Sequence, residues 1–282
     1  MKKNLVLVLL IVAIVATAAL GFVACNKKAV VKVIDIKITD EEYAFCVNKT
    51  DATLLASVNT YIAQIKNDGT FEAILNKYFG DGEPAKIESA PVGTANALVV
   101  VTNAAFEPFE YLDGNKFLGI DMEIAKGLAD YLGKALVIKN IEFDSIFSEI
   151  NAGNADIGMA GITVTSAREE LVTFSSTYYA ASQMVVVKAD DTTFDACTTA
   201  ADVEAILTKL TADTKIGVQK GTTGNFYVEG DEDWGFDGLA ATCKSYSSAA
   251  LAIQDMLNGN IDYVIVDEAP AKKITEKMNA LA

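Results

Sequence analysis

The sequence predicts an α/β fold of two lobes. From Leu98 onward, short apolar segments with the length of buried strands alternate with segments of helical periodicity. This alternation is typical of largely parallel sheets that carry helices on both faces. About half of the 282 residues are apolar and only four are proline, so the chain can bury one sizeable core or two cores of ordinary domain size.

Two segments of the chain resemble each other, which favours two lobes of similar design. Ile150–Ile157 and Met256–Tyr263 each contain a helix end, a glycine cap and the start of a buried strand. Continued in step, the first strand ends at Gly161 and the second at Asp267. Open α/β sheets bind ligands at the carboxyl ends of their strands, and each of these two segments would present such an end. A chance similarity between two common helix-to-strand turns is the alternative.

The first elements are two strands and two helices. Apolar residues between 54 and 65 recur at spacings of three and four, which predicts a helix. Residues 81–97 contain glycine and proline but few large apolar side chains, which predicts a linker. In order, we expect strands at 30–38 and 43–47 around a polar break at 39–42, helices at 51–66 and 71–80, and the linker at 81–97.

After the linker, strands and helices alternate to the end of the chain. Gly153 is predicted to cap the C-terminus of one helix. The apolar segment 184–187 predicts a strand that leads out of the first group of strands and helices. We expect strands at 98–102, 136–141, 156–161, 184–187, 215–219, 242–246 and 261–266, a loop at 103–119, and helices at 121–132, 143–150, 200–210, 249–257, 269–281 and from 167.

Small residues, hydroxyls and an arginine follow one of these strands. Gly161 and Thr163 lie in the turn, and Arg168 lies in the helix that follows. Small residues let a ligand approach the backbone, and hydroxyls with a guanidinium suit a carboxylate. The alternative is an ordinary strand-to-helix loop with a hydroxyl N-cap and a surface arginine.

Composition argues against several classes of function. The 23 basic and 38 acidic residues make the chain acidic, which argues against a nucleic-acid partner. The chain has no histidine, and so lacks the commonest general base and the commonest metal ligand. This argues against a hydrolase or a metalloenzyme, and we expect no metal and no cofactor.

The first 25 residues predict a secretory signal. Lys2 and Lys3 precede an apolar run from Leu5 to Val23. The ending at Ala24 and Cys25 resembles the lipobox of bacterial lipoproteins, which implies that Cys25 is lipidated and becomes the N-terminus. Phe22 stands where such motifs usually have leucine. An uncleaved membrane helix is the alternative; either way, the folded part lies outside the cytoplasm, on the cell surface or the periplasmic face, tethered to the membrane.

Three cysteines then remain for the folded part, where an oxidising environment permits a disulfide. Cys46 lies in an apolar strand and is predicted to be a buried hydrophobic residue. Cys197 and Cys243 both lie near element ends, so we favour a bond between them, although sequence alone does not fix the connectivity.

Several motifs in order resemble those of extracellular solute-binding proteins of the polar amino-acid class, family 3. The resemblance covers almost everything after residue 30. It implies a periplasmic-binding-protein type II fold that binds a free amino acid and delivers it to the permease subunits of an ABC importer. The motifs are Phe106–Tyr111, Gly119–Glu123, Phe143–Ile146, Gly161–Thr165 with Arg168, Phe174–Ser175 with Tyr178 and Tyr179, Gly217–Gly224 and Asp262–Asp267.

The resemblance also implies how the ligand's charged groups are bound. Arg168 would hold the α-carboxylate, assisted by the hydroxyl and amide of Thr163. Thr222 or Thr223, at the mouth of the next helix, would assist as well, because a helix N-terminus favours an anion. Asp267, with the carbonyl of Gly161, would hold the α-ammonium.

The contacts to the ligand's side chain are less constrained. Phe106 and Phe143 would flank the ligand, with core packing as the alternative for each. Asn103 stands where relatives that prefer cationic amino acids often have an acid, which favours a polar or uncharged side chain. Glu107 lies close enough in sequence to weaken this argument.

The order of the motifs departs from the family pattern. The segment 39–80 normally closes such a chain, and here it opens it, so the sequence is predicted to be circularly permuted. One lobe would then comprise residues 44–187, including the linker, and the other residues 189–282 with 30–40. The hinge would lie near 40–44 and 187–190, and the lipid anchor would hang from the second lobe. A truncated duplication is the alternative.

Two other functions are compatible with the same fold. Cyclohexadienyl or arogenate dehydratases need a carboxylic acid that protonates a leaving hydroxyl, and Glu229 or Glu268 would be the candidates. Ligand-sensing receptor domains carry additional membrane and signalling segments, which do not follow Ala282 here.

Overall fold

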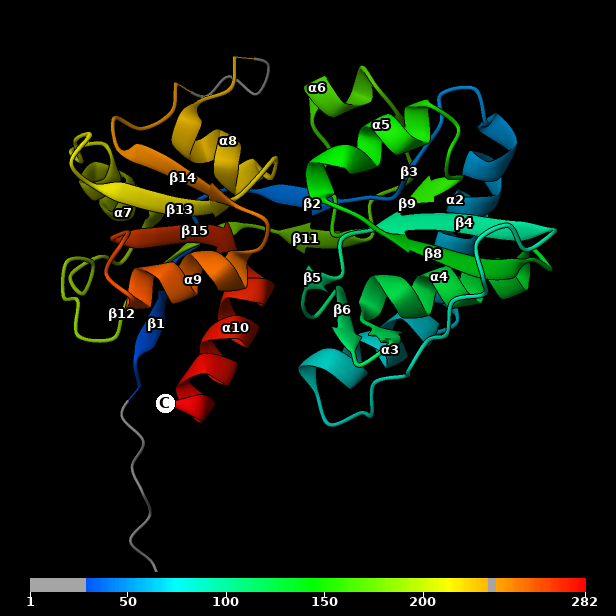
Figure 1. Ribbon diagram of the computed structural model, residues 1–282, viewed down its shortest axis with the longest axis horizontal. Coiled ribbons are helices and arrows are strands. Elements are labelled where there is room, and N and C mark those ends of the chain that lie inside the picture. The colour runs from blue at the N-terminus through cyan, green and yellow to red at the C-terminus, as the bar shows by residue number, and fades with distance from the viewer. Residues whose placement is uncertain (1–28, 233–236) are drawn as a thin grey trace, which may run out of the picture.

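The computed structural model describes residues 29–232 and 237–282 (Figure 1). The predicted signal segment and the lipidation of Cys25 lie outside these residues. Within the described part of the chain, no helix has the length and apolarity needed to cross a membrane.

Two five-stranded sheets lie side by side, each covered by helices (Figure 1). The sheet of lobe 1 has the order β10-β3-β9-β4-β8 and that of lobe 2 the order β1-β12-β15-β13-β14. Lobe 1 contains β3 (Cys46–Val47), β4 (Ala97–Thr102), β8 (Ala135–Asn140), β9 (Ile157–Gly158) and β10 (Thr173–Phe174). Lobe 2 contains β1 (Val31–Ile34), β12 (Gln183–Lys188), β13 (Lys215–Gln219), β14 (Thr242–Tyr246) and β15 (Tyr263–Asp267).

Both sheets are mixed, which corrects the expectation of largely parallel sheets. In lobe 1, β4 pairs parallel with β8 and β9, whereas β3 is antiparallel to β9 and β10. In lobe 2, β13 is parallel to β14 and β15, and β12 is antiparallel to β1 and β15. The antiparallel strands are the ones next to the connections between the lobes, where the chain does not return through a crossover helix.

Helices cover both faces of each sheet (Figure 1). In lobe 2, alternate residues of β12 face different cores: Val186 packs on the side of α9 and α10, and Val185 and Val187 pack on the side of α7 and α8. Lobe 1 carries α2 (Ala52–Asn67), α3 (Thr70–Phe79), α4 (Ile120–Tyr131), the 3-10 turn Phe143–Ser145, α5 (Ile146–Asn151) and α6 (Ser166–Glu169). Lobe 2 carries α7 (Ala200–Leu207), α8 (Thr223–Glu229), α9 (Ala249–Leu257) and α10 (Glu268–Leu281).

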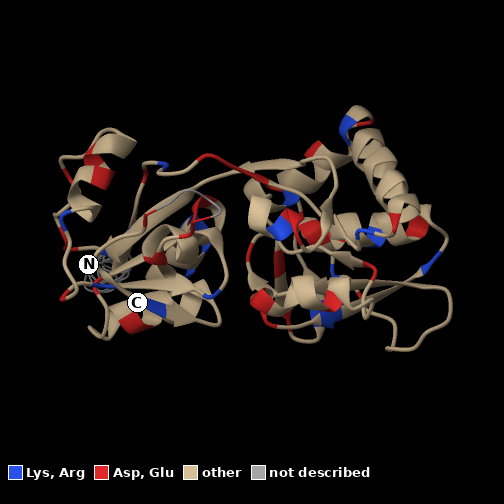
Figure 2. Ribbon diagram, turned by 90° about the horizontal axis from the view of Figure 1, so that it is seen from above, with Lys and Arg blue, Asp and Glu red and all other residues tan. Residues whose placement is uncertain are grey.

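The lobes are joined by a two-stranded antiparallel ribbon, β2 (Glu41–Tyr43) with β11 (Tyr179–Ala181). Acidic residues lie on a segment that bridges the lobes (Figure 2). The predicted second crossing at 187–190 is wrong, because β12 already pairs with β1 and β15 in lobe 2. Glu41 and Glu42 belong to β2, not to the predicted polar break.

Residues 103–119, predicted as a loop, form a small antiparallel sheet beside lobe 1. It consists of β5 (Ala105–Phe106), β6 (Glu110–Asp113) and β7 (Lys116–Leu118). Its strands are short and carry polar residues, so they lack the apolar alternation by which longer strands are predicted. The sheet places Phe106 at the edge of lobe 1 that faces lobe 2.

The predicted disulfide is also wrong. Cys46, Cys197 and Cys243 are all free. Cys197 lies in the segment before α7, whereas Cys243 lies on the edge strand β14 and its sulfur accepts a hydrogen bond from Asn225 at 3.6 Å. Both side chains pack against the same apolar core, so their burial does not require that they pair.

The first strand and the last helix lie side by side in lobe 2 (Figure 1). The Asn279 side chain of α10 accepts hydrogen bonds from the amides of Val30 and Val31 at 2.8 and 3.1 Å, and donates one to the Val31 carbonyl at 2.9 Å. The two ends of the described chain are therefore fastened to each other.

Candidate functional site

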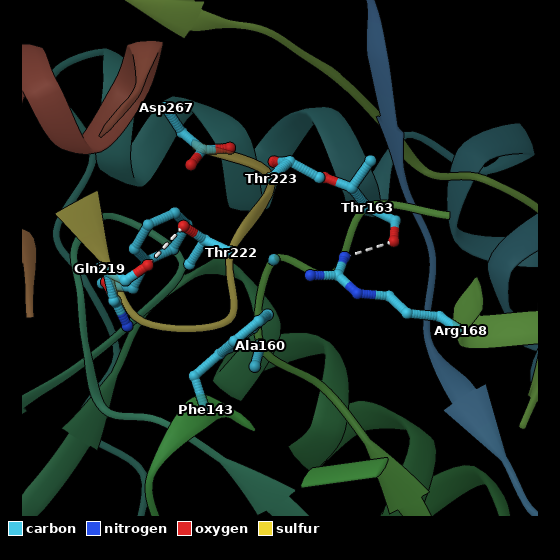
Figure 3. A pocket seen from close by; sticks show the side chains of 10 residues that line it. Phe143, Ala160, Thr163, Arg168, Gln219, Thr222, Thr223 and Asp267 are labelled. Carbon is cyan, nitrogen blue, oxygen red and sulfur yellow. Dashed lines mark hydrogen bonds between the residues drawn. The ribbon is translucent and has the colours of Figure 1, made fainter. Parts of the chain in front are cut away.

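A small cavity lies between the two lobes, where strands from both sheets end. Its volume is about 10 Å³, which is room for about one water molecule. All the predicted ligand-binding residues except Asn103 line it, and Figure 3 shows them converging from both lobes. The lining residues are Phe106, Phe143, Ala160, Gly161, Thr163, Arg168, Gln219, Thr222, Thr223 and Asp267.

Arg168 is the cation of this site, and aromatic rings enclose it. The residue is 4% exposed, and its guanidinium carbon lies 5.1–5.7 Å from the ring centres of Phe143, Phe147 and Phe226. The hydroxyl of Thr165 caps α6 by accepting from the Arg168 amide at 3.2 Å, which fixes the backbone from which the side chain projects. Burial lowers the pKa of Arg168 to about 10, so it remains charged at neutral pH.

The guanidinium of Arg168 is only partly satisfied. Nη1 donates to the carbonyl of Thr163 at 2.6 Å, within lobe 1 (Figure 3). Nη2 donates across the cleft to the carbonyl of Gly221 at 3.0 Å. Nε is buried and has no partner among the described residues. A buried donor without an acceptor costs about 1–3 kcal/mol, so this edge of the guanidinium favours an added acceptor.

Asp267 is the acid on the opposite lobe, at the end of β15. The residue is 4% exposed, and its carboxylate accepts a hydrogen bond from the Tyr43 hydroxyl at 2.5 Å. Burial, and next the nearby Glu41 carboxylate, raise the pKa of Asp267 to about 7. A cationic group beside Asp267 would reverse this effect and favour the ionised form.

The threonines at the start of α8 are already engaged. The Thr222 hydroxyl donates to the Gln219 carbonyl at 2.7 Å and accepts from the Asn225 amide at 3.3 Å, as an N-cap does. The Thr223 hydroxyl donates to Glu41 at 2.7 Å and accepts from Gln183 at 3.0 Å. Each hydroxyl proton is donated within the protein in this arrangement, and the help of Thr222 or Thr223 to a ligand carboxylate stays a prediction.

The other predicted residues shape the site. Gly161 has φ +53°, and a Cβ there would lie 2.9 Å from the Phe106 ring, so the position requires glycine. Phe143 packs over Arg168. Asn103 lies outside the cavity lining, and it accepts from Gln219 at 3.0 Å and donates to the Ile141 carbonyl at 2.7 Å.

Several contacts hold the lobes closed over the cavity. The hydrogen bonds of Gln219 to Asn103 and of Arg168 to Gly221 cross the cleft. At the rim, Lys220 pairs with Asp144 at 2.8 Å and Lys277 pairs with Glu107. A ligand as large as an amino acid therefore needs the lobes to separate or the lining side chains to move.

Sequence reasoning missed Gln219 and Glu41. Gln219 lies inside a motif that the sequence singles out, and its place at the end of β13, beside Thr222, could have identified it. Glu41 gave no such signal, because it lies in a run of four polar residues at 39–42.

The two acids considered for a dehydratase do not line the cavity. Glu268 pairs with Lys37 and Lys272, both at 2.9 Å. These lysines outweigh the effect of burial and lower the pKa of Glu268, which does not suit a proton donor at neutral pH.

Comparisons with known proteins agree with this architecture. Residues 98–226 match the family model described as bacterial extracellular solute-binding proteins, family 3. The arginine-binding extracellular protein ArtP of Bacillus subtilis is 36% identical over 93 residues, which cover 33% of this chain and 36% of that protein. A probable histidine-binding protein of Neisseria gonorrhoeae is 29% identical over 194 residues, which cover 67% of this chain and 65% of that protein. The matches thus span less than two thirds of these two relatives.

Solved structures show the same fold. An ancestral amino acid-binding protein, described as a precursor of cyclohexadienyl dehydratase, matches with a TM-score of 0.54 and 30% identity, covering 65% of this chain and 74% of that one. Arginine-binding ArgBP from T. maritima in its holo form matches with a TM-score of 0.52 and 28% identity, covering 65% and 74%. The names of these relatives do not support the preference for an uncharged side chain that Asn103 suggested.

Proposed function

Because the chain belongs to the bacterial extracellular solute-binding proteins, family 3, we propose that it binds a free amino acid between its lobes and delivers it to the permease subunits of an ABC importer. The observation that carries this proposal is that a buried base and a buried acid lie on opposite sides of one cavity. Arg168 on lobe 1 and Asp267 on lobe 2 line the same cavity, as the two ends of an α-amino acid require.

The unsatisfied edge of Arg168 fits the ligand's carboxylate. Nε and Nη2 of a guanidinium lie on one edge and bind a carboxylate with two parallel hydrogen bonds. Nε has no partner, and Nη2 is held by Gly221 of the other lobe. When the lobes separate, Nη2 loses that carbonyl, and both donors face the open cleft while Thr163 still holds Nη1.

Closure then follows from the ligand's two charges. The carboxylate binds to Arg168, the ammonium binds to Asp267, and Phe106 and Phe143 cover the ligand's apolar part. Because each lobe holds one charge, the ligand stabilises the closed arrangement over the open one. The ribbon β2–β11 is the natural hinge, since it joins the lobes.

A thermal-unfolding screen against the twenty amino acids tests the binding function. A ligand at 100 times its Kd stabilises the folded chain by about 2.7 kcal/mol, which shifts the unfolding temperature measurably. We expect stabilisation by a small subset of amino acids. If none stabilises the protein, the assignment as an amino-acid receptor is wrong.

We also propose that the protein is a receptor without enzymatic activity. Neither Glu229 nor Glu268 lines the cavity. Prephenate and arogenate should therefore be recovered unchanged after incubation with the protein, and their turnover would instead establish a dehydratase.

The membrane anchor belongs to the same proposal. A lipid on Cys25 would hold the receptor on the outer side of the membrane, near the permease. Replacing Cys25 by Ser should release the protein from the membrane fraction without changing ligand affinity. Unchanged membrane retention would point to an uncleaved helix.

We further propose that the chain is circularly permuted. The first strand and last helix are fastened to each other through Asn279, and residues 81–97 join α3 to β4, where the family match begins at residue 98. Matches to relatives cover about two thirds of this chain, which is roughly the share that residues 98–282 make up. One lobe would then be formed from both ends of the chain.

Reversing the connection tests the permutation. A variant with Ala282 joined to residue 29 by a short linker, and opened within residues 81–97, should fold and bind the same ligand with about the same affinity, since termini and exposed linkers tolerate such changes. Ligand titration and thermal unfolding check this. A soluble variant that has lost the ligand site would argue against a simple permutation.

A further inference from the structure

Glu41 is a buried carboxylate at the hinge that the ligand contacts proposed above do not use. It is 3% exposed, and it lies on β2, directly between the lobes. One of its oxygens accepts hydrogen bonds from Thr163 of lobe 1 and Thr223 of lobe 2, both at 2.7 Å. The other oxygen accepts from Thr39 at 2.6 Å.

These bonds fix the polarity of two hydroxyls that line the cavity. A hydroxyl has one proton to donate, and a carboxylate can only accept. The protons of Thr163 and Thr223 therefore point at Glu41, and only lone pairs remain for other partners. This wall of the cavity accepts hydrogen bonds, which suits a cationic group.

Strand alternation brings Glu41 and Tyr43 to the same face. Residues i and i+2 of a strand share a face, so Tyr43 reaches Asp267 while Glu41 reaches the threonines. Glu42 lies on the opposite face and is exposed. The hinge strand thus contributes to the acidic wall that also contains Asp267.

The charges around the cavity do not balance. Arg168 carries one positive charge, and Glu41 and Asp267 are two acids near it. Of the other buried acids, Glu123 pairs with Lys77, Asp121 accepts from the Gly161 amide at 2.9 Å and the Tyr178 hydroxyl at 2.6 Å, and Glu110 has no hydrogen-bond partner among the described residues. Burial raises the pKa of Glu110 well above its usual value, which favours its uncharged form.

An uncompensated buried charge is costly. A zwitterionic amino acid adds no net charge to this site, whereas an amino acid with a cationic side chain adds one positive charge. When Asp267 is ionised, the acidic excess is therefore neutralised by the second kind of ligand and not by the first.

We propose that Glu41 is a positioning residue that makes the cleft select amino acids with a net positive charge. It acts through the hydroxyls of Thr163 and Thr223 and through its own charge beside Asp267. This inference rests on the proposed amino-acid binding, and it names the ligand class that Asn103 had left open.

Calorimetric titration with arginine and citrulline tests the inference, because the two differ mainly in the charge of the side chain. The wild-type protein should bind arginine at least about tenfold more tightly than citrulline, a ratio that corresponds to about 1.4 kcal/mol. Glu41→Gln keeps the shape and removes the charge, and it should reduce that ratio by about tenfold. Glu42→Gln, on the exposed face of the same strand, is the matched control and should leave the ratio unchanged.

Different outcomes separate the two levels of the proposal. Binding of citrulline or other neutral amino acids as tightly as arginine by the wild type would overturn the selectivity and leave the receptor function standing. Equal weakening of both ligands by Glu41→Gln would show a purely structural role. Glu41→Asp keeps the charge if Glu41→Gln fails to fold, and it should preserve the ratio even where both affinities fall. If no amino acid binds at all, the proposed function itself fails.

Discussion

The two walls of the cleft are built in different ways. The lobe 1 wall holds one cation, Arg168, beside the rings of Phe143 and Phe147 and one backbone carbonyl of its own lobe, and the ring of Phe226 approaches it from lobe 2. The opposite wall joins Asp267 of lobe 2 with Tyr43 and Glu41 of the hinge. The cationic wall thus keeps two rings and one hydrogen bond within one lobe, whereas the acidic wall exists only where the hinge and the second lobe meet.

This difference indicates which wall senses closure. Arg168 keeps the rings of Phe143 and Phe147 and its bond to Thr163 whether the lobes are open or closed. The bond of Thr223 to Glu41 and that of Asp267 to Tyr43 both join lobe 2 to the hinge strand. The acidic wall therefore couples the ligand's ammonium to the arrangement of the lobes, and the cationic wall provides a fixed anchor.

Removing the cationic wall should have the largest effect. Arg168→Ala leaves the ligand's carboxylate without its partner in a desolvated site, and losing one partner of such a pair costs about 2–5 kcal/mol, or roughly 30- to 5,000-fold in Kd. Calorimetric titration of the screened ligand measures it. Nearly unchanged affinity would remove Arg168 from the site.

Neutralising Asp267 should weaken binding less, because the hinge retains Glu41. Asp267→Asn loses a charged hydrogen bond worth about 1.5–3 kcal/mol, or roughly 10- to 150-fold in Kd. The same variant should also bind the ligand with a weaker dependence on pH.

That dependence follows from the pKa of Asp267, which is about 7. Pairing with an ammonium requires the ionised carboxylate, so wild-type affinity should fall as the pH drops from 8 to 5, by at most about tenfold per pH unit. Binding near pH 7 should release protons, which calorimetry in buffers of different ionisation enthalpy detects. In Asp267→Asn this part of the pH dependence should vanish. A wild-type affinity that is flat across this range would contradict the ammonium contact.

The stability of the ligand-free protein depends on pH in the opposite direction from ligand affinity. Because the folded pKa of Asp267 lies above its ordinary value of 3.8, the folded chain binds more protons than the unfolded chain between about pH 4 and 7. The contribution of this group to stability is therefore lost as the pH rises through that window. Thermal unfolding of wild type and Asp267→Asn should differ in slope there.

Removing an ion pair at the rim of the cleft should have the smallest effect on ligand affinity. Lys220 and Asp144 form an ion pair between the lobes, and the lysine side chain is 67% exposed. Exposed pairs contribute little, so Lys220→Met should change Kd by less than about threefold in physiological salt. A larger loss in the same titration would show that closure depends on rim charges and not on the two walls.

The sequence predicted the cationic wall better than the acidic one. Arg168, Thr163 and Gly161 lie in one short segment after a strand, so local pattern and the family resemblance were enough to group them. Glu41 lies 122 residues from Thr163 and 182 from Thr223. Four consecutive polar residues predict a loop, and only the meeting of both lobes at β2 buries one of them.

The elements of the fold also differ in how well the sequence predicted them. The strands Lys215–Gln219 and Thr242–Tyr246 and the helix Ala249–Leu257 were predicted with their observed bounds, because patterns local to each segment mark them. The small sheet after β4 was missed because its strands are only two to four residues long. The antiparallel pairing of β12 was missed as well, because it depends on which distant strands become its neighbours.

The contact between Arg168 and the ligand's carboxylate is tested most directly by combining a change in the ligand with a change in the protein. The amino acid that stabilises the protein most would be compared with its α-carboxamide, in wild type and in Arg168→Ala, by calorimetric titration. We expect the carboxamide to bind the wild type at least about 30-fold more weakly, from a loss of about 2 kcal/mol, and to bind Arg168→Ala about as well as the parent amino acid does. If the wild type binds both ligands equally, or if the penalty persists in Arg168→Ala, then Arg168 does not bind the ligand's carboxylate.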